Sequence, residues 1–104
     1  MATTSKVLYR GAAATSSTTL YTQPNTSTTT VVTDIVVTNT AATGATYELN
    51  IAGTVLAKTV SIAANDSVVI GIKQVIPPSN PAATITGLAS ATTVNFHISG
   101  VEIA

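Results

Sequence analysis

The stretch Thr29–Asn39 constrains the fold of this chain more than any other part of the sequence. All of its residues except Asp34 and Asn39 are β-branched, and such side chains are stiff at χ1 and suit a pleated strand better than a helix. Counted in twos, one face carries Val31, Ile35 and Val37, and the other carries Val32, Asp34, Val36 and Thr38. Because both faces are largely apolar, the stretch predicts a central strand that is covered on both sides.

Seven other segments have the composition of short strands, and turn residues separate them at intervals of about 8 to 12 positions. They are residues 6–10, 18–22, 46–51, 55–62, 67–73, 84–86 and 92–103. This spacing is typical of a β-sandwich or barrel, and without a helix-length crossover the connections should be antiparallel. We predict an all-β fold, a single antiparallel β-sandwich of about eight short strands. The pattern leaves jelly-roll and immunoglobulin-like topologies open.

The segment 55–62 contains a conflict. Its alternation places Leu56, Val60 and Ile62 on the inward face, and Lys58 falls on the same face. We expect Lys58 to lie near an edge, or its ammonium group to reach back to solvent.

The last segment predicts an irregular strand. Val94, Phe96 and Ile98 share the inward face, whereas Val101 and Ile103 have the opposite parity. We therefore expect a β-bulge or bend at Ser99–Gly100, and a loop over 87–91.

The length of 104 residues is enough for one domain. We assign residues 1–6 to a flexible N-terminal arm and residues 7–104 to the sandwich, because the first residues are small and polar. Aromatic residues make up only 4% of the chain, so Val, Ile, Leu and Ala should form a thin core that neighbouring subunits help to stabilise. The N-terminus has no signal-peptide pattern and no apolar stretch is long enough to span a membrane, so we expect folding in a cytoplasm.

Charged residues are scarce, at 8% of the chain, and balance to a net charge of zero. The four basic residues are scattered, whereas a nucleic-acid-binding protein normally has a basic stripe that neutralises phosphates. We expect no nucleic acid, membrane or small-molecule partner. Low net charge also removes the repulsion that keeps copies of a protein apart. We therefore expect the chain to be a subunit of an assembly.

The sequence contains no pattern typical of a catalytic, cofactor or metal site. The chain has no cysteine, which excludes disulfides and thiolate ligands. His97 is its one histidine, and a lone imidazole cannot provide the ligand set that zinc needs. A fold could bring Asp34 near His97 and one of many serines, but any serine-rich chain allows this. We expect no enzyme activity, no cofactor and no metal.

Three stretches, taken together, resemble the small virion proteins of tailed bacteriophages. They are VLYRG at 7–11, VVTDIVVTNT at 31–40 and VNFHISGVE at 94–102. The resemblance spans nearly the whole chain and implies a β-sandwich displayed in many copies on a particle. The pattern of that family is structural, so it carries over no active-site residues.

The function that the resemblance implies first is that of a capsid decoration, or cement, protein located in the virion. Such proteins bind outside the shell at capsomer junctions, usually as homotrimers, so the partners would be the major capsid protein and copies of the chain itself. The alternative is a tail-fibre or adhesin module that binds a host-surface carbohydrate. The shortage of aromatic residues counts against that alternative.

Three segments are our candidates for contact with the shell or with other copies: residues 1–11, the hydroxyl-rich tract 15–30 and the proline-rich loop 77–81. The individual candidates are Val7, Tyr9, Arg10, Tyr21, Pro77 and Pro78. The two tyrosines could anchor an interface or stack on a sugar, or they could cap the core with a wet hydroxyl. The prolines exclude 77–81 from a central ladder and predict a surface loop.

Overall fold

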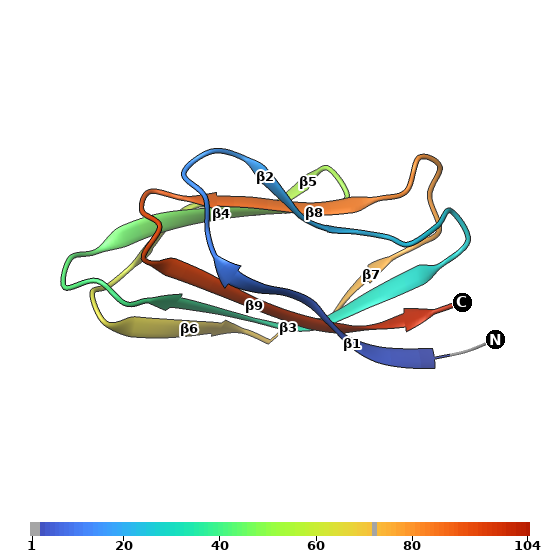
Figure 1. Cartoon of the computed structure of the whole chain (residues 1–104), viewed down its shortest axis with the longest axis horizontal. Helices are drawn as coiled ribbons and strands as arrows, with labels where there is room; N and C mark the ends of the chain where they lie inside the picture. Colours follow the sequence, from blue (N-terminus) through green and yellow to red (C-terminus); the bar gives the residue numbers. More distant parts are fainter. Residues whose placement is uncertain (1–2, 72) are drawn as a thin grey trace.

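Two antiparallel β-sheets pack face to face in a computed structural model that describes residues 3–71 and 73–104 (Figure 1). The first, here called the β3 sheet, has the order β1 (Thr3–Ala12), β9 (Val94–Ile103), β3 (Thr29–Asn39) and β6 (Asp66–Ile70); β7 (Gln74–Ile76) also pairs with β3. The second, the β4 sheet, has the order β2 (Thr18–Thr22), β8 (Thr84–Ala89), β4 (Ala45–Ile51) and β5 (Thr54–Ile62). The predicted all-β antiparallel sandwich is confirmed, with nine strands among the described residues.

The pairing of the strands is nested. The first strand pairs with the last, β2 with β8, β3 with β6 and β4 with β5. Apart from the extra strand β7, this is a long hairpin folded across two four-stranded layers, which is the jelly-roll arrangement. The topology that the sequence left open is therefore a jelly roll.

Strand β3 has the bounds that the sequence predicts, but the predicted faces of Val31 and Val32 are exchanged. Thr30, Val32, Ile35, Val37 and Asn39 are buried, whereas Val31 and Val36 are half-buried on the outer side. A β-bulge between Val32 and Asp34 gives Thr33 no direct partner on β9 and shifts the alternation by one residue. Within this chain the strand is covered on one face only.

The irregularity predicted at Ser99–Gly100 lies in the neighbouring strands instead of in β9. Strand β9 alternates without interruption, while β1 bulges between Val7 and Tyr9 and β3 bulges between Val32 and Asp34. Both bulges lie opposite Ser99. Gly100 faces inward, where an added Cβ would overlap the carbonyl oxygen of Val31 and lie 2.9 Å from Leu8 Cδ1. Close approach of both neighbours therefore requires glycine here.

The conflict at Lys58 is resolved by two irregularities in the pairing of β5 with β4. Ala57 and Ile62 are buried and Leu56 packs against the core while partly exposed, whereas Val60 is exposed. Thr59 has a φ of 49°, so the backbone turns locally and the parity changes. Lys58 lies outside, with Nζ 3.5 Å from Glu48 Oε1.

Most strand bounds differ from the predictions by a few residues, and β6 ends at Ile70 instead of at residue 73; residue 72 of the predicted strand lies outside the described residues. Strand β1 begins at Thr3, and Thr3–Lys6 pair with β9, so these residues belong to a strand and not to an arm; residues 1 and 2 lie outside the described residues. Strand β8 continues through the predicted loop to Ala89 because Gly87 allows close packing against Leu20 and Leu49. Strand β7 was missed, since three residues are too few to show an alternation.

The core consists mainly of aliphatic side chains, as expected from the composition. Phe96 is its largest fully buried residue, and Tyr47 contacts it edge to face, with ring centroids 6.3 Å apart. The molecule is long and thin, at 46 × 22 × 18 Å. A core of this depth leaves much of each sheet near the surface.

Candidate functional site

The three predicted contact segments meet at one end of the sandwich, near both termini (Figure 1). Gln23, 2% exposed, links two of them. Its Nε2 donates to the carbonyl oxygens of Thr28 (3.0 Å) and Ile76 (3.1 Å), and its Oε1 accepts from Ala83 N (3.2 Å). This side chain therefore fixes the loop 23–28 against the loop 77–83. We call this region, residues 3–6, 23–28 and 77–83, the anchored end.

The loop 23–28 is also stabilised from within. Asn25 Oδ1 accepts hydrogen bonds from the backbone and hydroxyl of Ser27 and from the hydroxyl of Thr28, each at 2.9 Å. An asparagine side chain that replaces a backbone acceptor in this way makes a tight turn. The hydroxyl-rich tract is thus an ordered part of the structure in this region.

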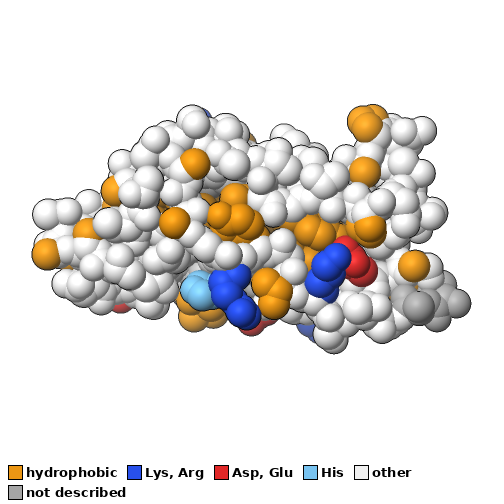
Figure 2. Space-filling model, viewed as in Figure 1, with side chains coloured by type: hydrophobic (Ala, Val, Ile, Leu, Met, Phe, Trp, Pro, Cys, Tyr) orange, Lys and Arg blue, Asp and Glu red, His pale blue; other side chains and the backbone are white. Residues whose placement is uncertain are grey.

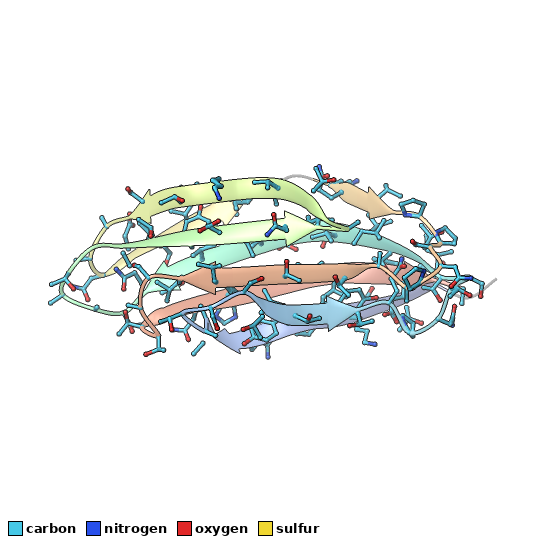
Figure 3. All side chains as sticks on the ribbon, turned by 90° about the horizontal axis from the view of Figure 1, so that it is seen from above. Atoms are coloured by element: carbon cyan, nitrogen blue, oxygen red, sulfur yellow. The ribbon has the colours of Figure 1, made fainter. Side chains whose placement is uncertain are left out.

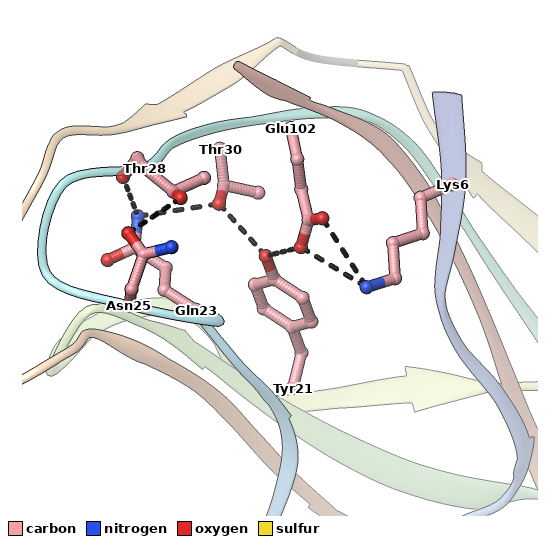
Figure 4. A network of polar contacts seen from close by, with 7 residues as sticks. All are labelled: Lys6, Tyr21, Gln23, Asn25, Thr28, Thr30 and Glu102. Atoms are coloured by element: carbon pink, nitrogen blue, oxygen red, sulfur yellow. Dashed lines mark hydrogen bonds and ion pairs between the residues drawn. The ribbon is translucent and has the colours of Figure 1, made fainter. Parts of the chain in front are cut away.

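Tyr21 connects the two sheets at the anchored end (Figure 4). Its hydroxyl donates to the Glu102 carboxylate from β9 and lies 3.0 Å from Thr30 Oγ1 on β3. Lys6 Nζ from β1 lies 3.4 Å from Glu102 Oε1. Burial, together with the Glu102 carboxylate, raises the pKa of Tyr21 to about 12. The tyrosine is therefore held neutral as a donor between the layers.

The predicted contact residues occupy different environments. Val7 and Arg10 are exposed on β1, and Pro77 and Pro78 are exposed at the anchored end. Tyr9 is half-buried and donates its hydroxyl to the carbonyl oxygen of Ala12, at 2.8 Å. Tyr21 is only 7% exposed and joins the sheets. A direct contact of any of these residues with another subunit stays a prediction.

Sequence reasoning did not single out Gln23 or Glu102. A glutamine before a Pro-Asn turn and an acid near the end of a strand are ordinary surface residues in a sequence. Their partners lie 5 to 60 and 81 to 96 positions away, respectively. Only the fold brings these groups together.

The outer faces of the two sheets differ in polarity. The outer face of the β3 sheet, here called the valine face, carries Val7, Val31, Val36, Val69, Val75 and Val101. The outer face of the β4 sheet, the threonine face, carries Thr19, Thr22, Thr46, Thr84 and Thr86, with one exposed valine, Val55, on its edge strand β5. Val69 is 66% and Val75 63% exposed. Large exposed apolar side chains that share a face often mark a contact surface.

A narrow polar band crosses the valine face. Ser99 pairs with Asp34, and His97 lies two residues away on β9, beside Arg10. Although the fold thus brings Asp34, His97 and a serine to one face, the structure gives the His97 imidazole no hydrogen bond or ion pair with Asp34 within the described residues. The arrangement lacks the contact between base and acid that a catalytic triad requires.

A pocket of about 660 Å³ lies at the end opposite the anchored end. Its polar lining residues are Thr46, Ser61, Asp66 and Ser90. Over residues 3–71 and 73–104, no cluster of three or more His, Cys, Asp or Glu side chains could hold a metal ion. In that same part of the chain no helix could span a membrane.

Comparison with protein-family models finds no match to this chain, and comparison with curated proteins finds none either. Two solved structures share the fold. A chain of the T13 particle of infectious bursal disease virus aligns with a TM-score of 0.56 and 12% identity, over 97% of this chain and 30% of that one. A chain of the Gx strain of the same virus aligns with a TM-score of 0.53 and 12% identity, over the same fractions. This chain thus corresponds to about 30% of the length of either.

Proposed function

We propose that this chain is a non-enzymatic structural protein of a virus particle. The observation that carries the proposal is the jelly-roll fold, which it shares over 97% of its length with chains from a viral particle. Jelly rolls are frequent in viral capsids, although a fold by itself does not fix a function. The exposed valine face adds support, because a face of this kind gains free energy when a neighbouring subunit covers it.

The specific role that we propose is decoration of a tailed-bacteriophage capsid, as the sequence resemblance implies. The anchored end offers two loops that need little further ordering before they bind, since Gln23 and Asn25 already fix them. Many copies that each bridge neighbouring shell subunits would gain avidity from weak individual contacts. We propose a homotrimer as the bound form.

Stoichiometry in purified virions tests this role. Quantitative mass spectrometry should give a ratio of this chain to the major capsid protein on the order of one to one or one to two. A ratio of a few per cent would contradict decoration and place the chain in the tail or at a vertex. Sedimentation of the isolated protein tests the trimer independently.

The second candidate is an adhesin module that binds carbohydrate. The feature that favours it is the hydroxyl-rich pocket lined by Thr46, Ser61, Asp66 and Ser90, because jelly rolls also serve as lectins. Titration with host-surface polysaccharide, followed by NMR shifts at these residues, would support this candidate. The same titration of a Ser61→Ala variant is the control.

A further inference from the structure

The two long sides of the sandwich are open edges of both sheets. One side, the β1/β2 flank, consists of the edge strands β1 and β2; the other, the β5/β6 flank, consists of β5, β6 and the short strand β7. Figure 3 shows β5 along one long side and β1 with β2 along the other. Edge strands present unpaired N–H and C=O groups and readily pair with another chain unless they are covered.

The most exposed apolar side chains lie on these flanks. The five large hydrophobic residues that are exposed among the described residues are Val7, Val55, Val60, Val69 and Val75. Four belong to β5, β6 or β7, and the fifth belongs to β1. Figure 2, which looks onto the β1/β2 flank, also shows hydrophobic side chains in the seam between the two layers. Both flanks therefore carry exposed apolar side chains, four on the β5/β6 flank and Val7 on the β1/β2 flank.

The direction of the strands makes the two flanks complementary. Each sheet is a path of four strands in which every neighbouring pair is antiparallel. The first and the last strand of such a path run in opposite directions. When a second copy is placed beside the first in the same orientation, β1 of one copy lies antiparallel to β6 of the other, and β2 lies antiparallel to β5. Both sheets could thus continue across the same contact.

The edge strands β1 and β6 also lie at the same position along the strand direction. Arg10 pairs with His97, His97 with Val36 and Val36 with Val69, so Arg10 and Val69 end the same row across the sheet. Ala12 and Ser67 end a second row in the same way. No shift along the strands is needed to bring β6 of one copy beside residues 9–12 of the next.

One opposite charge on the outer face lies near that level. Arg10 on β1 is exposed and takes part in no ion pair among the described residues, where the pairs are Lys6–Glu102 and Lys58–Glu48. Asp34 precedes Val36 by two residues on β3 and lies on the same outer face. This exposed acid is therefore the nearest opposite charge on the outer face to the position that Arg10 of a second copy would take.

We propose that copies of this chain associate head to tail, with the β1/β2 flank of one copy against the β5/β6 flank of the next. The occupant of each flank is a second copy of the chain. Such a contact is heterologous, so it closes into a ring when the rotation between copies allows it. The inference rests on the self-association proposed above. A homotrimer would be a closed ring of three such contacts.

Cysteine cross-linking tests the contact, because the chain has no cysteine of its own. Ala12→Cys and Ser67→Cys are made as separate variants and mixed under oxidising conditions. Within one chain these positions are three strand spacings apart, about 14 Å, which is too far for a disulfide. We expect the mixture to yield at least tenfold more cross-linked dimer than either variant alone.

A control mixture pairs Ala12→Cys with Thr86→Cys, which lies on the threonine face away from both flanks. It should give no more product than the single variants. Equal yields in the Ala12–Ser67 mixture and in the single variants would overturn the proposal. This outcome is separate from the virion ratio, so failure of the interface and failure of the decoration role can be told apart.

A second variant tests the same contact without cross-linking. Val69→Asp places a carboxylate on the apolar edge and, since Val69 is 66% exposed, should leave the monomer folded. Sedimentation velocity should show at least a tenfold increase in the concentration at which the oligomer dissociates. The matched variant Thr86→Asp should dissociate as the unmodified chain does. Unchanged association of Val69→Asp would contradict the proposal.

Discussion

The valine face and the threonine face are built from the same kind of strand and cover the same core, but they differ in what they present to the surroundings. Valine and threonine are nearly isosteric and both favour strands, so formation of the sheets does not distinguish them. The threonine hydroxyl is hydrated in water, whereas an exposed valine is stabilised only when another surface covers it. The difference therefore lies in how the two faces interact with water, which strand propensity alone does not reveal.

The polarity of the valine face depends on the bulges opposite Ser99. Without the bulge in β3, Val31 would lie on the same side of the sheet as Ile35 and Val37, as the alternation of the sequence predicts. With it, Val31 pairs with the outward residues Val75 and Val101. A single extra residue thus transfers an apolar side chain from the core to the outer face.

The largest expected effect comes from Ile35→Asp, which tests the boundary between core and valine face. Ile35 is 1% exposed, and an unpaired carboxylate there would cost several kcal/mol, a large part of the stability of such a domain. We expect no folded protein by circular dichroism. The adjacent variant Val36→Asp, on the outer face, should fold. Equal behaviour of the two variants would show that the faces are assigned wrongly.

The next effect concerns the glycine that the bulges surround. Gly100→Ala should destabilise the protein by about 1–3 kcal/mol, because its Cβ would overlap the backbone of Val31. Chemical denaturation measures the change. Gly71→Ala is the control, since nothing lies within 4 Å of an added Cβ there, and it should change stability by less than about 0.5 kcal/mol.

A smaller effect is expected from the link between the sheets. The pKa of Tyr21 is raised to about 12 from its ordinary value of 10.0, so the folded state binds the phenolic proton more tightly than the unfolded state does. The resulting stabilisation is complete below pH 10 and is lost as the pH rises through 12. The melting temperature should fall over this range, and less steeply in Tyr21→Phe.

Burial also raises the pKa of Tyr47, so some dependence on pH should remain in the Tyr21→Phe variant. An identical slope in both proteins would contradict the role assigned to the Tyr21 hydroxyl. At neutral pH, Tyr21→Phe should cost about 1 kcal/mol for the lost hydrogen bonds.

The smallest effect tests the polar band of the valine face. His97 is exposed and makes no described contact that folding requires. His97→Ala should leave the free energy of unfolding within about 0.5 kcal/mol of the original value and should leave particle assembly nearly unchanged. A loss of assembly without a loss of stability would assign a function to the band between the valines.

Much of the fold could be predicted because β-branched composition and two-residue alternation mark most of the strands in the sequence. The bounds of β2 and β3 agree with the predictions, and β4 begins one residue earlier than expected. Its buried residues Tyr47, Leu49 and Ile51 follow the predicted alternation. Against β8 the pairing of Tyr47–Ile51 is regular, so a period of two is sufficient on that side of β4.

The predictions failed where a strand responds to its neighbours. The sequence pattern around Ser99 indicates an irregularity, but two adjacent strands absorb it, because Gly100 lets them approach while β9 stays regular. Likewise, Lys58 reaches solvent through a local change of parity that depends on the pairing of β5 with β4. Neither outcome is encoded in the alternation of one strand.

The sequence by itself determined that this protein is a sandwich of short antiparallel strands with an aliphatic core, because β-branched composition and alternation act over a few residues. The tertiary structure decided which valines face outward, how the strands nest into a jelly roll and where the contact segments meet. These features depend on bulges set by neighbouring strands and on hydrogen bonds such as that between Gln23 and Ala83, 60 positions apart. Contacts over such distances exist only after the sheets have packed.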